Sequence, residues 1–387
     1  MVDRRGVLGA GAVGISTFVL PSASAAATGS TPPAAPSAPV TAATVAGGIV
    51  TITLAVETSA GSHSYSVWRN ATSVGADGAA SELDTAVTSG VSSFQVGGAS
   101  PLAQGQSHVI EITHTNSGGS AVSTLTLSPQ SISSSDGAAT TISYATAGYG
   151  PTAVTFSLTG GGGGGGGDDT GGGGTGGGGA VLGGTLVVAD QDVVRIHRGT
   201  GGAAGASNTT GGGGGAGGVT ENLTGVYAGG RGGDAGGEGS SGAGGGGGAA
   251  TVLRRTRSGL NVDVVAAGGG GGGGGAQAGG GGGADASTLF GGDAVNTNGG
   301  NGASSGAGDD GGGGGGGGGG NLGGTGGQLN DVVSSERSGV GGNNGASTST
   351  IGDVTVSSFA VTARSGSAGA DGSGTATFHY IAVSHTP

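Results

Sequence analysis

The chain has 387 residues, of which 106 are glycine, and it contains neither cysteine nor lysine. Its formal net charge is -12 at pH 7. Without cysteine, disulfides, thiolate catalysis, zinc fingers and iron-sulfur ligation are excluded, and without lysine, so are Walker A loops and Schiff-base chemistry. The acidic charge argues against nucleic-acid binding, because binding phosphates needs a basic face.

The start of the chain predicts a signal peptide over residues 1–25. A charged beginning with Arg4 and Arg5 precedes a mildly apolar stretch that is too short to span a membrane, and Ala23 and Ala25 mark a small-residue cleavage site. The adjacent arginines resemble the twin-arginine export signal. A general secretory signal with a chance arginine pair is the alternative. In either case we expect a protein that is secreted, extracellular or on the cell surface.

A small sandwich is predicted after an Ala/Pro/Ser linker over residues 26–38. Residues 39–130 contain short alternating runs separated by turn residues, which is typical of an antiparallel sandwich. The segment Tyr65-Ser66-Val67-Trp68-Arg69 has the Tyr-x-Val pattern of a third strand, so this region resembles a fibronectin type III domain. His108 stands where that family has its corner tyrosine. The resemblance implies a spacer or a weak binding module.

Residues 131–387 alternate glycine runs with short apolar segments. The longest runs have no Gly-x-y period, which excludes collagen; they are residues 160–167, 211–215, 244–248, 268–275, 279–283 and 311–320. A flexible linker is the ordinary interpretation of such a composition. The runs nevertheless follow β-type segments directly, as Val154–Leu158 and Val262–Ala266 illustrate. This alternation favours an ordered structure.

Ordered polyglycine places a strict demand on the backbone. Each glycine loses on the order of 1 to 2 kcal/mol of backbone conformational freedom and has no side chain to bury. A single polyproline-II strand has no internal hydrogen bonds. We therefore expect several runs to pack side by side as a polyglycine-II bundle, in which amides of one run donate to carbonyls of the next.

The order of strands and runs carries a second resemblance. The segments are VTFSLTGGGGGGGG from Val154, GGTLVVADQDVVRIHRGTGG from Gly183, GGGGGAATVLRR from Gly244, VDVVAAGGGGGGGG from Val262 and GSGTATFHYIA from Gly372. This series resembles the bacterial glycine-rich domain family related to the extracellular glycine-rich region of anaplastic lymphoma kinase receptors. The resemblance implies a jelly-roll sandwich of the tumour-necrosis-factor type with glycine helices inserted as a bundle. The expected fold class is thus all-β, with a fibronectin type III-like sandwich followed by this glycine-rich domain over residues 131–387.

No motif in the chain predicts a catalytic, cofactor-binding or metal-binding residue. Gly302-Ala303-Ser304-Ser305-Gly306 matches the pattern of a hydrolase elbow but lacks its strand-to-helix context. The six histidines show no metal-ligand spacing. Acidic residues between the runs are interpreted as solvating turns, with a bound cation as the alternative; they are Asp168, Asp169, Asp234, Glu238, Asp293, Asp309 and Asp310.

Arg254, Arg255 and Arg257 form a basic cluster just before a predicted strand. A solvated turn and contact with a carboxylate or an anionic glycan are both compatible with this cluster. We expect a secreted, non-catalytic surface or matrix protein that presents a rigid glycine-rich bundle for adhesion to, or recognition of, an extracellular protein or glycan. It would have no cofactor, no nucleic-acid partner and no membrane span. The alternative is an accessory protein or hydrolase acting on cell wall or extracellular polysaccharide, and an ice-binding bundle is a third possibility.

Overall fold

The computed structural model describes most of the chain after residue 35, and the described residues are 36, 38–46, 49–55, 64–72, 81–82, 93–97, 102, 106–134, 140–141, 149–151, 153–276, 279–291, 297–306, 311–329, 337–350 and 352–386. These residues form strands and no helix, so the predicted all-β class is confirmed. The predicted signal peptide, with Arg4, Arg5, Ala23 and Ala25, and most of the predicted linker lie outside the described residues.

The strands occur throughout the chain. In order they are β1 (Val40–Ala46), β2 (Ile49–Leu54), β3 (Ser64–Thr72), β4 (Ser81–Glu82), β5 (Ser93–Val96), β6 (Ser107–Asn116), β7 (Gly119–Ser133), β8 (Thr140–Thr141), β9 (Tyr149–Pro151), β10 (Ala153–Thr159), β11 (Ala180–Val187), β12 (Val193–His197), β13 (Thr251–Arg257), β14 (Leu260–Ala266), β15 (Thr288–Phe290), β16 (Ala346–Thr348), β17 (Val354–Val361) and β18 (Ser373–Thr386). One eight-stranded sheet has the order β17-β11-β10-β18-β7-β6-β3-β4. Two four-stranded sheets have the orders β5-β2-β1-β9 and β14-β13-β12-β8, and β15 pairs with β16.

The first sandwich packs β1, β2 and β5 against β3, β6 and β7. Strict alternation along β6 and β7 turns one face inward, where Ile110, Ile112, Leu125 and Leu127 are completely buried. The predicted turn between these two strands is confirmed, because Asn116 pairs directly with Gly119. The core of this sandwich is therefore aliphatic.

A second sandwich packs β10, β11 and β18 against β12, β13 and β14. Its core includes Val154, Phe156 and Leu158 from β10. Phe156 lies opposite Gly184 on β11, where an added Cβ would come within 2.9 Å of the phenyl ring, so this glycine makes room for the aromatic side chain. β13 and β14 are joined through Ser258 and Gly259, both with positive φ, as a two-residue hairpin turn requires.

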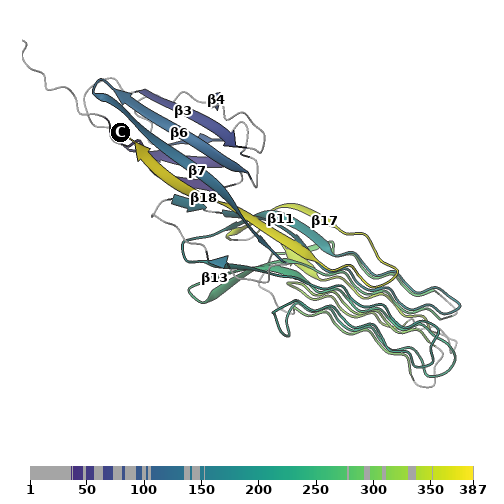
Figure 1. The fold of residues 1–387 in the computed structure, drawn as a ribbon. Coiled ribbons are helices and arrows are strands. Elements are labelled where there is room, and N and C mark those ends of the chain that lie inside the picture. Colours follow the sequence, from purple (N-terminus) through teal and green to yellow (C-terminus); the bar gives the residue numbers. More distant parts are fainter. Residues whose placement is uncertain are drawn as a thin grey trace, which may run out of the picture.

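The last strand links the two sandwiches. Thr375 on β18 pairs with Ser133 of β7 on one side and with Ser157 of β10 on the other. Beyond that point β18 follows β7 back along the first sandwich, which places the C-terminus beside the N-terminal strands (Figure 1). The eight-stranded sheet is consequently shared, and residue 130, the predicted domain boundary, falls inside β7.

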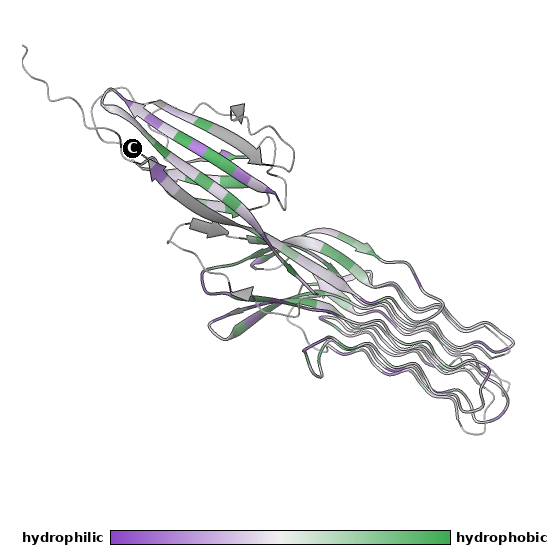
Figure 2. Ribbon diagram, viewed as in Figure 1, coloured by the Kyte–Doolittle hydropathy of each residue, from purple (hydrophilic) through white to green (hydrophobic). Residues whose placement is uncertain are grey.

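The glycine-rich segments extend from the second sandwich as closely stacked wavy chains (Figure 1). Gly160 follows β10 directly, and Gly268 lies one residue beyond β14. Hydrophobic residues colour the strands green in Figure 2, whereas the stacked segments are nearly neutral. These segments therefore cannot be held by apolar burial of side chains.

Hydrogen bonds between neighbouring segments repeat every three residues. Within the run 311–320, each amide from Gly312 to Gly320 donates to a carbonyl of another segment. The acceptors at every third amide come from the same neighbour: residues 337–343, 242–248 or 297–303. Carbonyls of the same run accept amides from three further segments, residues 230–236, 268–274 and 324–327. A fully buried run is thus surrounded on all sides by backbone.

This close approach requires glycine at interior positions. A Cβ added at Gly247 would overlap the carbonyl oxygen of Gly317, and one at Gly271 would overlap that of Gly245. The obstructing atoms belong to the backbone, which cannot rotate away as a flexible side chain can. At Gly366, on an outer segment, a Cβ would meet nothing within 4 Å. The requirement therefore depends on position in the bundle.

We predict that Gly247→Ala lowers the free energy of unfolding by about 2 kcal/mol or more, because the methyl group forces neighbouring segments apart. Gly366→Ala is the matched control and should change it by less than about 0.5 kcal/mol. Thermal and denaturant unfolding of the two variants measure this difference. Equal effects at the two positions would show that the segments are not packed in this manner.

Candidate functional site

The pleat of β13 divides the predicted arginine cluster between two faces of the sheet. Arg255 and Arg257 lie on the face turned toward the second core, whereas Arg254 lies on the opposite face. All three are engaged by carboxylates of the same chain. The contact with an external anion that the sequence suggested is not tested by these internal pairs and stays a prediction.

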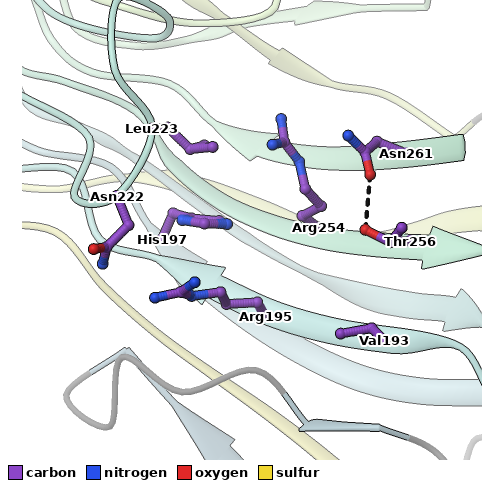
Figure 3. Close-up of a pocket in the computed structure, with 8 residues that line it drawn as sticks. All are labelled: Val193, Arg195, His197, Asn222, Leu223, Arg254, Thr256 and Asn261. Carbon is purple, nitrogen blue, oxygen red and sulfur yellow. Dashed lines mark hydrogen bonds between the residues drawn. The ribbon is translucent and has the colours of Figure 1, made fainter. Parts of the chain in front are cut away.

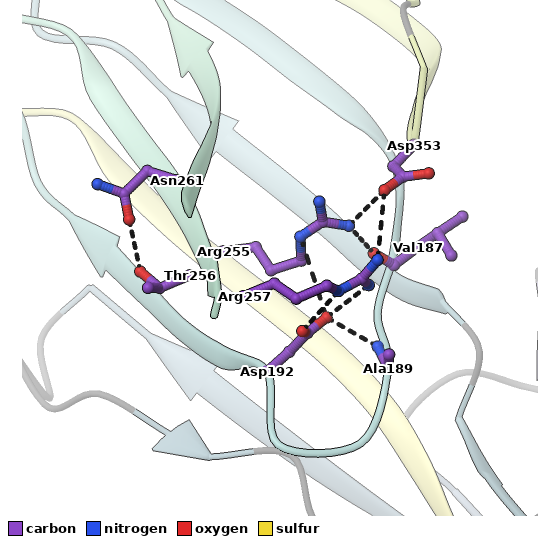
Figure 4. A network of polar contacts seen from close by, with 8 residues as sticks. All are labelled: Val187, Ala189, Asp192, Arg255, Thr256, Arg257, Asn261 and Asp353. Atoms are coloured by element: carbon purple, nitrogen blue, oxygen red, sulfur yellow. Dashed lines mark hydrogen bonds and ion pairs between the residues drawn. The ribbon is translucent and has the colours of Figure 1, made fainter. Parts of the chain in front are cut away.

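Arg257 and Arg255 join a polar network at one end of the second sandwich (Figure 4). Nε and Nη2 of Arg257 donate to the two carboxylate oxygens of Asp192, each at 2.8 Å. Arg255 Nη1 donates to Asp353 Oδ2 at 2.6 Å and to the carbonyl of Val187 at 2.7 Å. The network therefore ties β13 to the connection between β11 and β12 and to the residue before β17.

Asp192 is the most buried charge in this network, with 0% of its surface exposed. Burial alone would raise its pKa, but the hydrogen bonds from Arg257 and from the Ala189 amide, together with the positive charges of Arg257 and Arg255, lower it below the ordinary value. The ionised form is therefore favoured in the folded protein.

On the opposite face, Arg254 forms a two-pronged pair with Asp263 of β14. Nε and Nη2 of Arg254 each lie 2.7 Å from a carboxylate oxygen. The hydroxyl of Tyr227 donates to the same carboxylate at 2.8 Å. The pKa of Tyr227 is raised, first by burial and then by the negative charge of Asp263. The hydrogen bond to Asp263 likewise raises the pKa of Arg254.

A pocket with a volume of about 340 Å³ opens on this face (Figure 3). Its walls come from three strands and from the turn after Glu221, and the lining residues are Val193, Arg195, His197, Asn222, Leu223, Arg254, Thr256 and Asn261. Arg195 on β12 pairs directly with Arg254, which pairs in turn with Asp263. Two like charges opposite each other are unfavourable, and Asp263 offsets one of them. The floor of the pocket consequently retains positive charge.

His197 is the buried polar residue of the pocket, with 4% of its surface exposed. Its Nδ1 lies 3.0 Å from the carbonyl oxygen of Glu221. Since a carbonyl only accepts, Nδ1 carries the proton and donates. Burial, assisted by the charges of Arg254 and Arg195, lowers the pKa of His197 despite that hydrogen bond. The ring is therefore neutral at pH 7, and its Nε2 is a hydrogen-bond acceptor.

The sequence analysis missed most of this pocket. Arg195 and His197 alternate on a strand that the sequence predicted over residues 193–196, and this spacing was the available signal that both leave the same face. Asn222 has a positive φ of 59°, in a turn whose place over the sheet depends on long-range pairing. Nothing local in the sequence places Asn222 and Asn261 together.

Several polar side chains terminate the hydrogen bonding at the outside of the bundle. Where no further segment covers an outer amide, a side-chain oxygen accepts from it: Asp168 from Gly173, Asp285 from Gly178, Asp371 from Gly201, Asp234 from Gly214, Asn298 from Ala228, Asn301 from Arg231 and Ser304 from Asp234. Asn298, Asn301 and Ser304 are three residues apart, as are the amides that they bind. These residues therefore substitute for a missing neighbouring segment.

This arrangement refines two interpretations of the sequence. Asp168 and Asp234 accept backbone amides, whereas Glu238 is exposed and Asp293, Asp309 and Asp310 lie outside the described residues. Ser304 of the Gly-x-Ser-x-Gly match uses its hydroxyl oxygen to accept from the amide of Asp234. Both residues thus have a structural role at the bundle surface.

Within the described ranges, no group of three or more histidine, aspartate or glutamate side chains is arranged to hold a metal ion. The same ranges contain no helix with the length and apolar character to cross a membrane. No protein-family model matches the chain, and a comparison with curated proteins finds no similar sequence.

We predict that Asp192→Asn destabilises the protein by about 3 kcal/mol at pH 7, because it leaves the buried arginines without their charge partner. A lowered pKa stabilises the fold above the unfolded value, near 3.8, and this contribution is lost as the pH falls through the folded value. The difference between wild type and variant should therefore narrow below about pH 4. Unfolding curves between pH 7 and pH 2.5 measure it.

Asp190→Asn is the matched control, because Asp190 is exposed two residues away. We expect this control to behave like wild type at neutral pH. A stability difference for Asp192→Asn that stays constant down to pH 2.5 would contradict the assignment of a charge effect.

Proposed function

We propose that this chain is exported by a twin-arginine signal and acts as a non-catalytic surface or matrix protein. It would present a rigid glycine-rich bundle for adhesion to, or recognition of, an extracellular protein or glycan. The observation that carries this proposal is the lateral hydrogen bonding of the glycine segments. Because every amide from Gly312 to Gly320 is bonded to another segment, the bundle has the properties of a stiff rod.

The proposed conformation of the segments is polyglycine II. This conformation has three residues per turn and no internal hydrogen bonds, so a bundle of such segments bonds laterally with a period of three. The acceptors of Gly313, Gly316 and Gly319 follow this period, since all lie on residues 242–248. The same conformation is implied by the resemblance to the glycine-rich domain family, and the relation to that family is part of the proposal.

The composition of the bundle favours display over chemistry. Its interior consists of backbone, which supplies stiffness but no acid, base or nucleophile. Side chains such as Arg231, Asn301 and Thr325 occur on outer segments, where they are accessible to a partner. The sandwich at the other end of the molecule, which we propose to be fibronectin type III-like, would then serve as the stalk.

Export is tested by replacing the arginine pair. We predict that the full chain reaches the medium or the cell surface of a bacterial host with a twin-arginine pathway, and that Arg4→Lys with Arg5→Lys reduces the exported amount about tenfold or more, because a receptor reads the pair. Fractionation and surface labelling with an antibody measure it, and Asp3→Asn is the neighbouring control. Unchanged export of the double variant would indicate the general secretory route.

The display role is tested with the exported protein. Beads coated with wild type should adhere to isolated cell envelopes and matrix, beads coated with Gly247→Ala should adhere less because the bundle is loosened, and Gly366→Ala should match wild type. Equal adhesion of all three, or none by wild type, would refute a role for the rigid bundle.

A further inference from the structure

We propose that the pocket lined by Arg195, His197 and Arg254 binds a uronic-acid residue of an acidic polysaccharide. This site lies on the face of the second sandwich and is separate from the glycine bundle. It names one glycan class for the recognition role proposed above, and it rests on that role only in requiring that the chain meets extracellular glycans.

The carboxylate of such a sugar fits the guanidinium groups. Arg195 and Arg254 are cross-strand neighbours at the floor of the pocket. Arg254 uses Nε and Nη2 to bind Asp263, and no described residue accepts from its Nη1, which carries two further N–H groups. Guanidinium groups are planar, permanently charged and suited to paired hydrogen bonds with carboxylates. The pocket therefore offers a carboxylate a positively charged floor.

The hydroxyl groups of the sugar ring fit the remaining polar atoms. His197 is 96% buried by its 4% exposure, and among the described residues its Nε2 has no hydrogen-bond partner, so it can accept from a hydroxyl. Asn261 accepts from Thr256 through Oδ1 at 2.7 Å, and its amide N–H groups stay available as donors. Hydroxyls both donate and accept, whereas a simple carboxylate would leave the Nε2 acceptor unused.

Size and position also favour a sugar. A volume of about 340 Å³ is at the small end of the range for ligand pockets, suited to one sugar ring with part of a neighbour. Figure 3 shows the His197 ring between Arg195 and Leu223, and Leu223 provides an apolar surface for the ring carbons. Peptides commonly bind by adding a strand to a sheet edge. This pocket instead lies across the face of β12, β13 and β14.

The test is calorimetric titration of the full chain with trigalacturonate in about 0.15 M salt, where screening limits repulsion by the net charge of -12. The comparison ligands are neutral galactotriose and the peptide triglutamate. We expect trigalacturonate to bind at least about tenfold more tightly than either. Galactotriose isolates the contribution of the carboxylate, and triglutamate isolates that of the sugar.

Three variants locate the binding. Arg195→Gln should weaken trigalacturonate about tenfold or more. Asn222→Gly retains the backbone conformation with positive φ and removes a pocket carboxamide, so it should weaken binding without unfolding the protein. Arg231→Gln, on the bundle surface, is the control and should bind like wild type. Thermal unfolding of each variant confirms that it is folded.

The proposal is overturned if wild type shows no binding of trigalacturonate up to about 10 mM. It is equally overturned if triglutamate binds as tightly, which would identify a peptide site, or if folded Arg195→Gln and Asn222→Gly both bind like wild type. Any of these results leaves the adhesion experiment with Gly247→Ala unaffected, so the two proposals fail separately.

Discussion

The hydrogen bond from an amide of one glycine-rich segment to a carbonyl of another is the interaction on which the second half of this molecule depends. Each ordered glycine loses more conformational freedom than any other residue, and only its two backbone polar groups can offset that loss. In the run 311–320 the amides reach three neighbouring segments and the carbonyls bind three more. A segment removed from the bundle would leave six others with buried unpaired groups, so ordering must be cooperative. The absence of a Cβ permits the approach, as the overlap at Gly247 illustrates.

The rest of the structure supports this bundle from its base and its surface. Strands β10 and β14 lead into glycine runs, so the apolar core of the second sandwich sets the position at which these runs begin. Asp192, Arg255 and Arg257 tie the far end of that sandwich together. On the bundle surface, carboxylates and amides accept from outer backbone amides. Most charged residues therefore satisfy partners within the chain, and the pocket around Arg195 and His197 is the place where this bonding leaves polar atoms directed at a ligand.

The sequence was sufficient to predict those features that depend on local pattern. Alternation predicted strands such as β6 and β10, and the turn at Asn116–Gly119 followed from its residue types. Glycine runs that follow strands directly indicated order because a linker has no reason to alternate with sheet. Long-range pairing has no local signal, so the position of β18 between β7 and β10 could not be predicted. For the same reason, the separation of Arg254 from Arg255 and Arg257, and the meeting of Asn222 with Asn261, depended on the three-dimensional structure. The role of Asp168 and Asp234 as amide acceptors required knowing which amides lack a neighbouring segment.

Amide hydrogen exchange of the intact chain, resolved by residue, tests the central claim most directly. Exchange reports the free energy needed to open each amide. If the lateral hydrogen bonds hold the bundle, amides of residues 244–248, 268–275 and 311–320 will be protected as strongly as those of β10 and β13 and will lose protection together. Gly211, with positive φ at an exposed turn, and other outer glycines should exchange faster. Exchange of the interior runs at the rate of an unstructured glycine peptide, with the sandwiches still protected, would contradict the account.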